Sequence, residues 1–525
     1  MVRTVPGHRV TPVRFELCTA MAITPSDIDL RQLRAAARLG HVSVEQLLDV
    51  IDKQEQTMIR LLKDNQRLIQ RLAAYEPEIL RETGNRNTAT PDAAGQRPTA
   101  AYGLDAENQR RRPKRRRKKK SPGRRPTELK VADAEYARDV YPHGVPHAAC
   151  RLVRERAVWR LQDGRARLVA YRIYAGPGGK EPPIPGVTPR CEYGLEILVV
   201  LAFLVYIIGM SLDKACAVLG FFCQLPLHKS QADALLRQLA QHWEGEFDVL
   251  CTLLARAAIV AMDETGWQVG NTKCSLWAFA SQSQRIFLFG CHKDDATLDQ
   301  ILPPDVFDGI GISDDAGVYC GRFRQGQKCW AHLLRKAIRL ALLYPRKTTY
   351  QRFLDRLLAL YRDAKCAAAD GRLGDAGRQQ RVAALETRLG DLCRPIVDAA
   401  RPDMKPHEHE FANLAEEFLR LLLAEELFTF VLVPEVTPTN NGMERELRNP
   451  ALERKAGRTN KTAGGAHRRS IIVSVMESLR ANLPSFNLAT VLAEVGRWMA
   501  EGISLFKRQW QALLDTQATA ALDTT

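Results

Sequence analysis

The chain has 525 residues, 45% of them hydrophobic, which is enough for roughly two to four domains with apolar cores. Its formal net charge is +16, and twelve basic residues lie in the acid-free segment 110–125, so the rest of the chain carries only +4. This charge predicts a polyanionic partner, with nucleic acid first and an anionic membrane surface second. The twelve cysteines include no C-x-x-C pair, which excludes a disulfide framework and indicates reduced thiols in the cytoplasm.

The N-terminal part is predicted to consist of an extension, residues 1–42, and a long helix, residues 43–80. The first twenty residues lack a continuous apolar core, so we expect no signal peptide, and Met21 is an alternative start. Apolar residues follow a heptad repeat over 43–75, with Asn65 at a position that sets register and strand number. We therefore expect a coiled coil that joins a homodimer. An amphipathic helix packed on its own domain is the alternative.

Residues 81–129 are predicted to be a disordered linker that carries the basic run. Thr, Ala, Asn, Gly and Pro are frequent before the run, and its like charges repel one another. Basic side chains of this kind neutralise DNA phosphates without reading the base sequence. The alternative is a solubilising tail. The candidate DNA contacts are Arg115, Arg116, Arg117, Lys118, Lys119 and Lys120.

Two regions separate the linker from the first short apolar strands. Residues 130–192 have a mixed pattern and include a Gly-Pro-rich patch at 176–186. Residues 193–257 have apolar residues at helical spacing, so we expect a helical DNA-binding region there, with room for a helix-turn-helix. The longest apolar run, Ile197 to Met210, is shorter than the roughly 20 residues that span a bilayer. It predicts a buried helix, and we expect no membrane partner.

From residue 258 onward the pattern predicts an α/β core. Short apolar runs indicate a strand that ends at Asp263, a hairpin within 276–291, and a strand at Ile310 to Ser313. Helical spacing dominates from 329 to 430 and again after 440, and one helix is expected over 488–514. The sequence therefore predicts an α/β fold with a helical insertion. The predicted divisions are a core at 258–345 and 428–485, an insertion at 346–427 and a helical tail at 486–525.

Acids end two of the predicted strands. Asp263 and Asp314 follow apolar runs, and each has an acidic neighbour, Glu264 and Asp315. Because side chains alternate along a strand, only one acid of each pair can face a shared site, and the pattern does not choose between them. Mg²⁺ prefers oxygen ligands, and two ions about 3.5–4 Å apart support the transfer of phosphoryl groups between DNA strands.

A third candidate acid follows the turn at 437–442. If a helix begins near Asn440, then Glu444 and Arg448 share its face, and Glu446 points elsewhere. An exposed helix with a Glu–Arg pair is the alternative.

Four motifs in order give the sequence its most specific feature. They are Asp263-Glu-Thr-Gly-Trp267, Ser313-Asp-Asp-Ala-Gly-Val-Tyr319, Cys329-Trp-Ala-His-Leu-Leu-Arg335 and Thr439-Asn-Asn-Gly-Met-Glu-Arg-Glu-Leu-Arg448. With these motifs the chain resembles the transposases of the insertion sequence 66 family, in which a zipper-like helix and a basic linker precede the core. The resemblance covers roughly residues 190–485. It implies a ribonuclease-H-like fold on which Asp263, Asp314 and Glu444 form a DDE triad that binds two Mg²⁺ (or Mn²⁺) ions.

One feature departs from the family. Its members carry a zinc module built from C-x-x-C pairs, but this chain has only His143, His147, Cys150 and Cys191 in that region. A structural zinc site needs four well-placed ligands. We therefore treat residues 130–192 as a degenerate zinc-module-like region and do not expect zinc.

Basic residues near the motifs are candidate contacts for DNA phosphates. For each of them, an ordinary surface position is the alternative, and Trp267 and Trp330 are expected in the core rather than stacked on bases. The candidates are His332, Arg335, Arg445, Arg448, Lys455, Arg458 and Lys461.

The resemblance implies a DNA transposase that cleaves element ends and transfers strands into target DNA. It would act in the cytoplasm at the nucleoid, and accessory proteins of the element are candidate partners. Three other functions stay open: a catalytically silent DNA-binding protein, a nuclease or resolvase that cleaves without joining, and a coiled-coil scaffold with a basic tail.

Overall fold

The computed structural model describes residues 125–523, and this part begins with a three-stranded sheet of order β1-β3-β2. Strand β1 runs parallel to β3, and β2 and β3 form an antiparallel hairpin. The predicted helix at 43–80 and the basic side chains at 115–120 lie outside the described residues. The elements are α4 (Thr127–Ala132), β1 (Tyr136–Val140), η2 (His147–Ala149), β2 (Arg151–Gln162) and β3 (Arg165–Ala175).

The next region is helical, as the sequence predicts for 193–257. The apolar run from Ile197 begins in a buried helix and continues into a single π-helical turn. No helix of the described residues is long and apolar enough to cross a membrane. The elements are α5 (Leu195–Ala202), η3 (Phe203–Ile207), α6 (Leu212–Cys223) and α7 (Lys229–Leu254).

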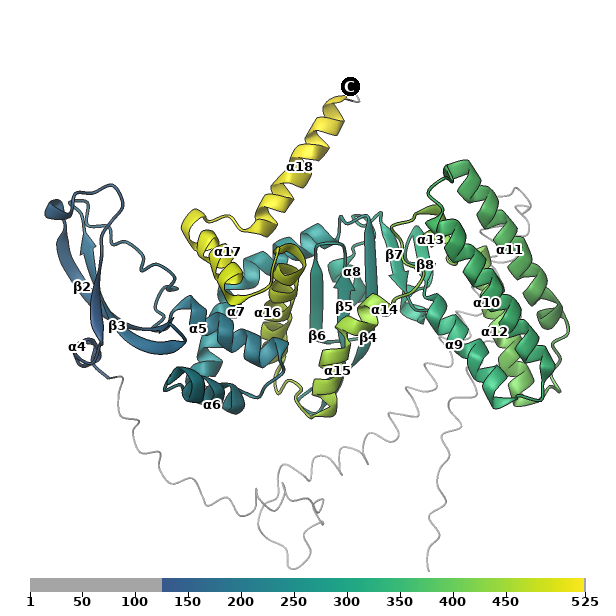
Figure 1. Cartoon of the computed structure of the whole chain (residues 1–525), viewed down its shortest axis with the longest axis horizontal. Coiled ribbons are helices and arrows are strands. Elements are labelled where there is room, and N and C mark those ends of the chain that lie inside the picture. Colours follow the sequence, from purple (N-terminus) through teal and green to yellow (C-terminus); the bar gives the residue numbers. More distant parts are fainter. Residues whose placement is uncertain (1–124, 524–525) are drawn as a thin grey trace, which may run out of the picture. The chain divides into compact units, whose positions relative to one another are not determined.

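A five-stranded mixed sheet of order β6-β5-β4-β7-β8 forms the centre of the α/β region (Figure 1). Strands β4, β5 and β6 are antiparallel, whereas β7 runs parallel to β4 and β8 runs parallel to β7. The elements are β4 (Ile259–Val269), β5 (Thr272–Ala280), β6 (Arg285–Cys291), α8 (Asp295–Ile301), β7 (Ile310–Ser313), η4 (Gly317–Tyr319) and β8 (Gln325–Lys328).

The prediction that the first strand ends at Asp263 is wrong. Strand β4 continues to Val269, because β5 pairs with it from Ala261 to Val269. The ladder holds the polar residues after Asp263 in an extended conformation that their own propensities do not favour. Asp263 therefore lies in the middle of a strand, whereas Asp314 directly follows β7 as predicted.

The predicted helical insertion consists of long helices packed beside β8. Helix α11 packs on both α10 and α12, and Figure 1 shows these three helices lying alongside one another. Their core is separate from that of the sheet's other half and centres on Leu357, Leu389 and Phe418. The elements are α9 (Trp330–Leu343), α10 (Thr348–Ala369), α11 (Asp375–Asp398), α12 (Pro406–Leu423) and α13 (Thr429–Leu432).

Two predicted C-terminal helices are interrupted. The helix of Glu444 ends at Glu446, and a second helix starts at Arg448, because the ring of Pro450 would clash with the carbonyl of Glu446 in a continuous helix. The helix expected over 488–514 is divided at Gly502, which ends α17 with a φ of 75°. The elements are α14 (Asn441–Glu446), α15 (Arg448–Lys455), α16 (Ala463–Asn482), α17 (Leu488–Glu501) and α18 (Leu505–Asp523).

Helix α16 covers the free edge of β6 with three buried serines. The hydroxyl oxygens of Ser470, Ser474 and Ser478 accept hydrogen bonds from the backbone N–H groups of Phe289, Phe287 and Arg285, at 2.8–2.9 Å. The serines are four residues apart, so they lie on one helix face and match every second residue of the strand. The helix thereby replaces a missing strand and satisfies an edge that would otherwise pair with another chain. We call this contact the serine seam.

The opposite edge of the sheet is covered by the chain that returns from the insertion. The backbone N–H of Lys328 donates to the carbonyl of Glu426 at 2.7 Å. The side chain of Gln327 donates to the carbonyl of Leu427 and accepts from the N–H of Phe430. These bonds fix the point at which the insertion rejoins the sheet, shortly before α14.

Candidate active site

Asp263 lies within β4, and Asp314 directly follows β7, the neighbouring parallel strand of the central sheet. Burial, followed by the negative charges of Glu264 and Asp314, raises the pKa of Asp263 to about 7. Asp263 accepts a hydrogen bond from the backbone N–H of Glu264 at 2.9 Å, and Asp314 accepts one from Ala316 at 3.0 Å. No lysine or arginine within residues 125–523 forms an ion pair with either aspartate. The two carboxylates thus repel each other without a cation between them.

The neighbouring acids, in contrast, have partners of their own. Glu264 forms an ion pair with Lys293 and accepts a hydrogen bond from the hydroxyl of Tyr319. Asp315 forms an ion pair with Arg420 of helix α12. Of the acids at the two strands, Glu264 and Asp315 thus have a basic partner within ion-pair distance, whereas Asp263 and Asp314 have none among residues 125–523.

Glu444 is brought to this end of the sheet by the residue before its helix. Asn440 is buried, and its side-chain amide donates to the carbonyl of Met262 at 2.8 Å. The backbone N–H of Asn440 donates to the thiol sulfur of Cys329 at 3.1 Å. The start of α14 is therefore attached both to β4, one residue before Asp263, and to the start of α9.

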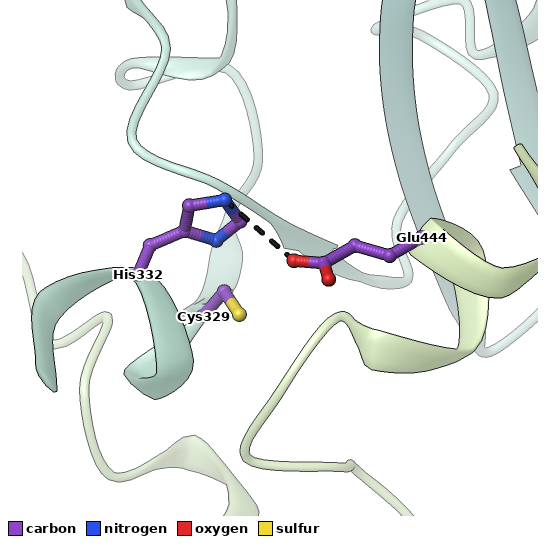
Figure 2. Close-up of side chains that lie close together, drawn as sticks. All are labelled: Cys329, His332 and Glu444. Atoms are coloured by element: carbon purple, nitrogen blue, oxygen red, sulfur yellow. Dashed lines mark ion pairs between the residues drawn. The ribbon is translucent and has the colours of Figure 1, made fainter. Parts of the chain in front are cut away.

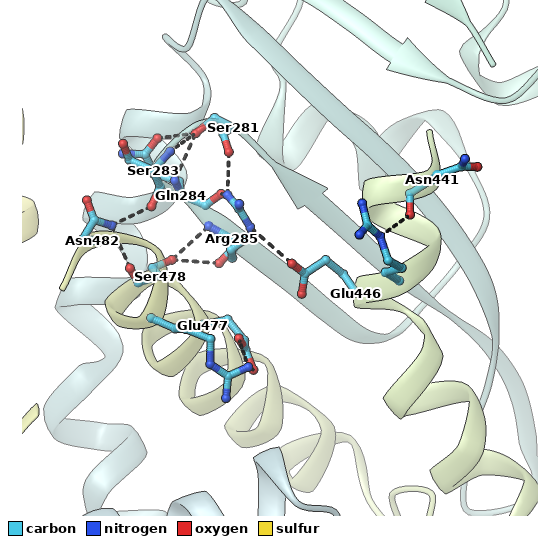
Figure 3. Close-up of polar contacts among 11 residues, drawn as sticks. Ser281, Ser283, Gln284, Arg285, Asn441, Glu446, Glu477, Ser478 and Asn482 are labelled. Atoms are coloured by element: carbon cyan, nitrogen blue, oxygen red, sulfur yellow. Dashed lines mark hydrogen bonds and ion pairs between the residues drawn. The ribbon is translucent and has the colours of Figure 1, made fainter. Parts of the chain in front are cut away.

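Helix α9 directs two basic side chains at Glu444. The Nε2 atom of His332 lies 3.6 Å from Oε1 of Glu444, and Nη2 of Arg335 lies 2.7 Å from the same oxygen. Figure 2 shows that Cys329 and His332 project from the first turn of α9 toward Glu444 of α14. Glu446 points away and forms an ion pair with Arg285 at 3.7 Å (Figure 3), which separates it from Glu444 as predicted.

The His332 ring interacts electrostatically with two of the candidate acids, Asp263 and Glu444. Its contact with the Cys329 side chain is the main cause of a raised pKa, and the charge of Glu444 acts in the same direction. His332 is also among the charged groups that affect Asp263. Although burial opposes it, hydrogen bonds from His332 and the Asn440 backbone lower the pKa of the Cys329 thiol. The arrangement brings Asp263, His332 and Glu444 into one electrostatic environment.

The predicted phosphate contacts differ in how available they are. Arg458 donates to the carbonyl of Gly209, and Nε of Arg445 donates to the carbonyl of Asn441 in its own helix at 3.3 Å. Both bonds help to hold the chain, although both residues are exposed. The candidates with exposed side chains near α14 and α15 also include Arg448, Lys455 and Lys461.

The motif tryptophans lie in the core, as predicted. Trp267 and Trp330 are 3% and 0% exposed, and their indole N–H groups donate to Asn460 and to the carbonyl of Leu427. Neither ring is available to stack on a base. Sequence reasoning assigned no role to Lys293 or Arg420, because nothing in the sequence shows which acid either one will meet.

The donor set at the carboxylates fits a divalent cation. Asp263, Asp314 and Glu444 offer only oxygen atoms, which suits Mg²⁺ or Mn²⁺. Burial and the negative charges of Glu264 and Asp314 raise the pKa of Asp263, and a bound cation would favour its charged form. In the region of the expected zinc-module remnant, the described residues place no metal-ligand cluster around His143, His147, Cys150 and Cys191, and His147 stacks on Tyr141 with ring centroids 3.9 Å apart.

Acids at two neighbouring parallel strands and a third acid on a helix attached to β4 define an α/β protein with acids at one end of its mixed sheet. Asp263, Asp314 and Glu444 do not have carboxylate oxygens that all lie within 4.8 Å of one another; among the described residues this holds only for the donor atoms of Cys329, His332 and Glu444. The family model described as "Transposase IS66 family" matches residues 190–468, more than half of the chain. The chain belongs to this family, and the resemblance drawn from its motifs is confirmed.

The chain was also compared with solved structures and with curated proteins. One solved structure, titled "Drosophila P element transposase strand transfer complex", is similar over 58% of this chain and 95% of that chain, with 10% identity and a TM-score of 0.26. Because this TM-score is low, the similarity does not define the fold, which is described by its own strand order. No curated protein matches the chain.

Proposed function

We propose that this transposase cleaves DNA at element ends and joins the freed strand to target DNA, with Asp263, Asp314 and Glu444 as its metal-binding triad. The strand order β6-β5-β4-β7-β8, with three antiparallel strands followed by two parallel ones, supports a ribonuclease-H-like core. In this proposal the insertion of α10, α11 and α12 separates the second aspartate from the glutamate.

The observation that carries the proposal is the difference between adjacent acids. Glu264 and Asp315 each form an ion pair with a lysine or arginine. Asp263 and Asp314 do not, within the part of the chain that the structure describes, although burial and the negative charges of Glu264 and Asp314 raise the pKa of Asp263 to about 7. Buried carboxylates without a basic partner are typical of functional sites, because they do not stabilise the fold.

Two Mg²⁺ or Mn²⁺ ions bound here would stabilise the charge on the attacking and leaving oxygens of a phosphoryl transfer. The residues of the chain have three tasks. Asp263 and Asp314 hold their carboxylates on rigid strands, and Asn440 fixes the helix that carries Glu444. Arg335, which is exposed and directed into the site, is placed to bind a DNA phosphate, and His332 is placed to orient the scissile strand.

DNA would be bound over a longer surface than the site itself. The basic side chains at 115–120 and the exposed residues Arg448, Lys455 and Lys461 would neutralise phosphates, so binding should weaken steeply with salt. A homodimer joined through residues 43–75 would hold two DNA ends together, with accessory proteins of the element as further partners at the nucleoid.

The test is a strand-transfer assay with end-containing DNA and Mg²⁺. Asp263→Asn, Asp314→Asn and Glu444→Gln should each lower activity by roughly a thousandfold, equivalent to about 4 kcal/mol of transition-state stabilisation. The matched control is Glu446→Gln, which changes an acid of the same helix that points away. If Glu446→Gln lost activity and Glu444→Gln kept it, the assignment would be wrong.

The same assay separates the other functions. Strand cleavage without joining would indicate a nuclease or resolvase. DNA binding by the wild type without cleavage in Mg²⁺ or Mn²⁺ would indicate a silent DNA-binding protein.

A further inference from the structure

A set of possible metal-ligand atoms that includes Glu444 lies at the start of α9. One ligand atom each from Cys329, His332 and Glu444 lies within 4.8 Å of the other two, and no other group of three or more such residues occurs in residues 125–523. Cys329 and His332 are three residues apart at the first turn of one helix, so their side chains lie on the same face.

The separation of two of these donor atoms matches that of ligands in a tetrahedral metal centre. Zinc–ligand bonds of about 2.0–2.3 Å place neighbouring donor atoms about 3.3–3.8 Å apart. Nε2 of His332 and Oε1 of Glu444 are separated by 3.6 Å, which is long for a hydrogen bond and suits two ligands of one ion. Figure 2 shows the thiol of Cys329 beside these two atoms.

The elements that hold the donors are fixed by contacts outside the donor set. The sulfur of Cys329 accepts a hydrogen bond from the backbone of Asn440, the residue that precedes α14. This bond joins α9 and α14 at the point where their donor atoms meet. Small side-chain rotations of His332 and Glu444 would therefore complete a three-ligand site, with water as the fourth ligand.

We propose that Cys329, His332 and Glu444 bind a thiophilic divalent transition ion such as Zn²⁺, and that this binding inhibits the enzyme by withdrawing Glu444 from Asp263 and Asp314. A thiolate and an imidazole select Zn²⁺ over Mg²⁺, which prefers oxygen donors alone. The inhibition rests on the proposed role of Glu444 in the triad, whereas the binding does not.

Arg335 is the group that the ion would compete with. It already contacts Oε1 of Glu444 at 2.7 Å, and it supplies positive charge when no ion is bound. Its side chain is 54% exposed and can turn into solvent, so an ion can displace it at little cost.

Binding is tested with Co²⁺, whose absorption spectrum reports tetrahedral thiolate coordination, followed by displacement with Zn²⁺. The wild type should bind one equivalent, and Cys329→Ser and His332→Asn should each weaken binding at least tenfold. Cys366→Ser, which removes an exposed thiol elsewhere, should bind as the wild type does. Circular dichroism verifies that the variants are folded, and His332 is the safer variant because it is only partly buried. Wild-type-like Co²⁺ spectra in both folded variants would overturn the proposal.

Inhibition is tested in the strand-transfer assay with Mg²⁺ present and Zn²⁺ added. Each variant is compared with its own activity without Zn²⁺, so that a change in basal activity does not affect the result. The wild type and Cys366→Ser should lose activity, and Cys329→Ser should be at least tenfold less sensitive. Equal sensitivity of Cys329→Ser and the wild type would overturn the inhibitory role. If the wild type bound Co²⁺ through Cys329 but never cut DNA, the metal site would stand and the proposed function would fail.

Discussion

Two regions of the same sheet hold polar groups in opposite ways. In the serine seam, each hydroxyl of Ser470, Ser474 and Ser478 meets a backbone N–H of β6. At the carboxylate centre, Asp263 and Asp314 lie close together without a lysine or arginine partner among the described residues. The hydrogen bonds of the seam stabilise the fold, whereas the repulsion between the carboxylates at the centre destabilises it.

The comparison separates polar groups that stabilise the fold from polar groups that lower its stability and are kept for the proposed activity. A buried polar group that is satisfied adds about 1 kcal/mol and helps to define a single structure. A buried carboxylate without a cation lowers stability, and it persists only where it is needed. Substitutions in the two regions should therefore change stability in opposite directions.

The largest effect is expected at Asp263. Its pKa is about 7 in the folded protein and near 4 when unfolded, so stability is lost as pH rises through that window. Asparagine stays neutral and keeps an acceptor for the Glu264 N–H. Without divalent ions at pH 8, Asp263→Asn should therefore raise the free energy of unfolding, by at most about 4 kcal/mol. Urea denaturation at pH 5 and pH 8 measures this, and the gain should shrink at pH 5.

The contrasting variant is Asp315→Asn. It removes the partner of Arg420, so it should lower the free energy of unfolding at pH 8. If Asp263→Asn were as destabilising as Asp315→Asn, both aspartates would stabilise the fold, and the contrast between an unpaired and an ion-paired aspartate would be wrong.

A somewhat smaller effect is expected at Glu477, beside the seam. Burial raises its pKa to about 7, with Arg480 opposing and the charge of Glu446 adding to the rise. Figure 3 shows Glu477 one residue before Ser478 on α16. Because the folded pKa exceeds the unfolded one, stability falls as pH rises from about 4.5 to about 7. Glu477→Gln should thus stabilise the protein by at most about 3 kcal/mol at pH 8, measured as the change in denaturation midpoint.

Unlike Asp263→Asn, Glu477→Gln should leave strand transfer unchanged, because Glu477 contacts Arg480 and not the carboxylate centre. A loss of activity equal to that of Asp263→Asn would mean that Glu477 belongs to the site.

The smallest effect is expected in the seam itself. Ser474→Ala removes the acceptor for the N–H of Phe287, which is buried, and should cost about 1–2 kcal/mol in thermal or urea unfolding. The matched control is Ser230→Ala on α7, an exposed serine whose loss should change stability by less than about 0.5 kcal/mol. Equal effects of the two substitutions would show that the seam contributes nothing beyond local helix propensity.

Most elements of the core could be predicted from periodicity, and the exceptions have physical causes. The hairpin of β5 and β6, the strand before Asp314 and the long helices of the insertion follow from apolar spacing. The extension of β4 beyond Asp263 does not, because it depends on pairing with β5. The break after Glu446 follows from Pro450, because proline interrupts a helix four residues before it although the apolar spacing continues.

The sequence by itself determined the family, the order of the motifs and the residue types that suit metal-assisted phosphoryl transfer. Only the tertiary structure gave partners to Glu264 and Asp315 and left Asp263 and Asp314 without a basic partner among residues 125–523. Those partners, Lys293 and Arg420, lie 29 and 105 residues away from the acids that they neutralise. Local patterns report which side chains share a face, whereas ion pairing across the fold is decided by how distant elements pack.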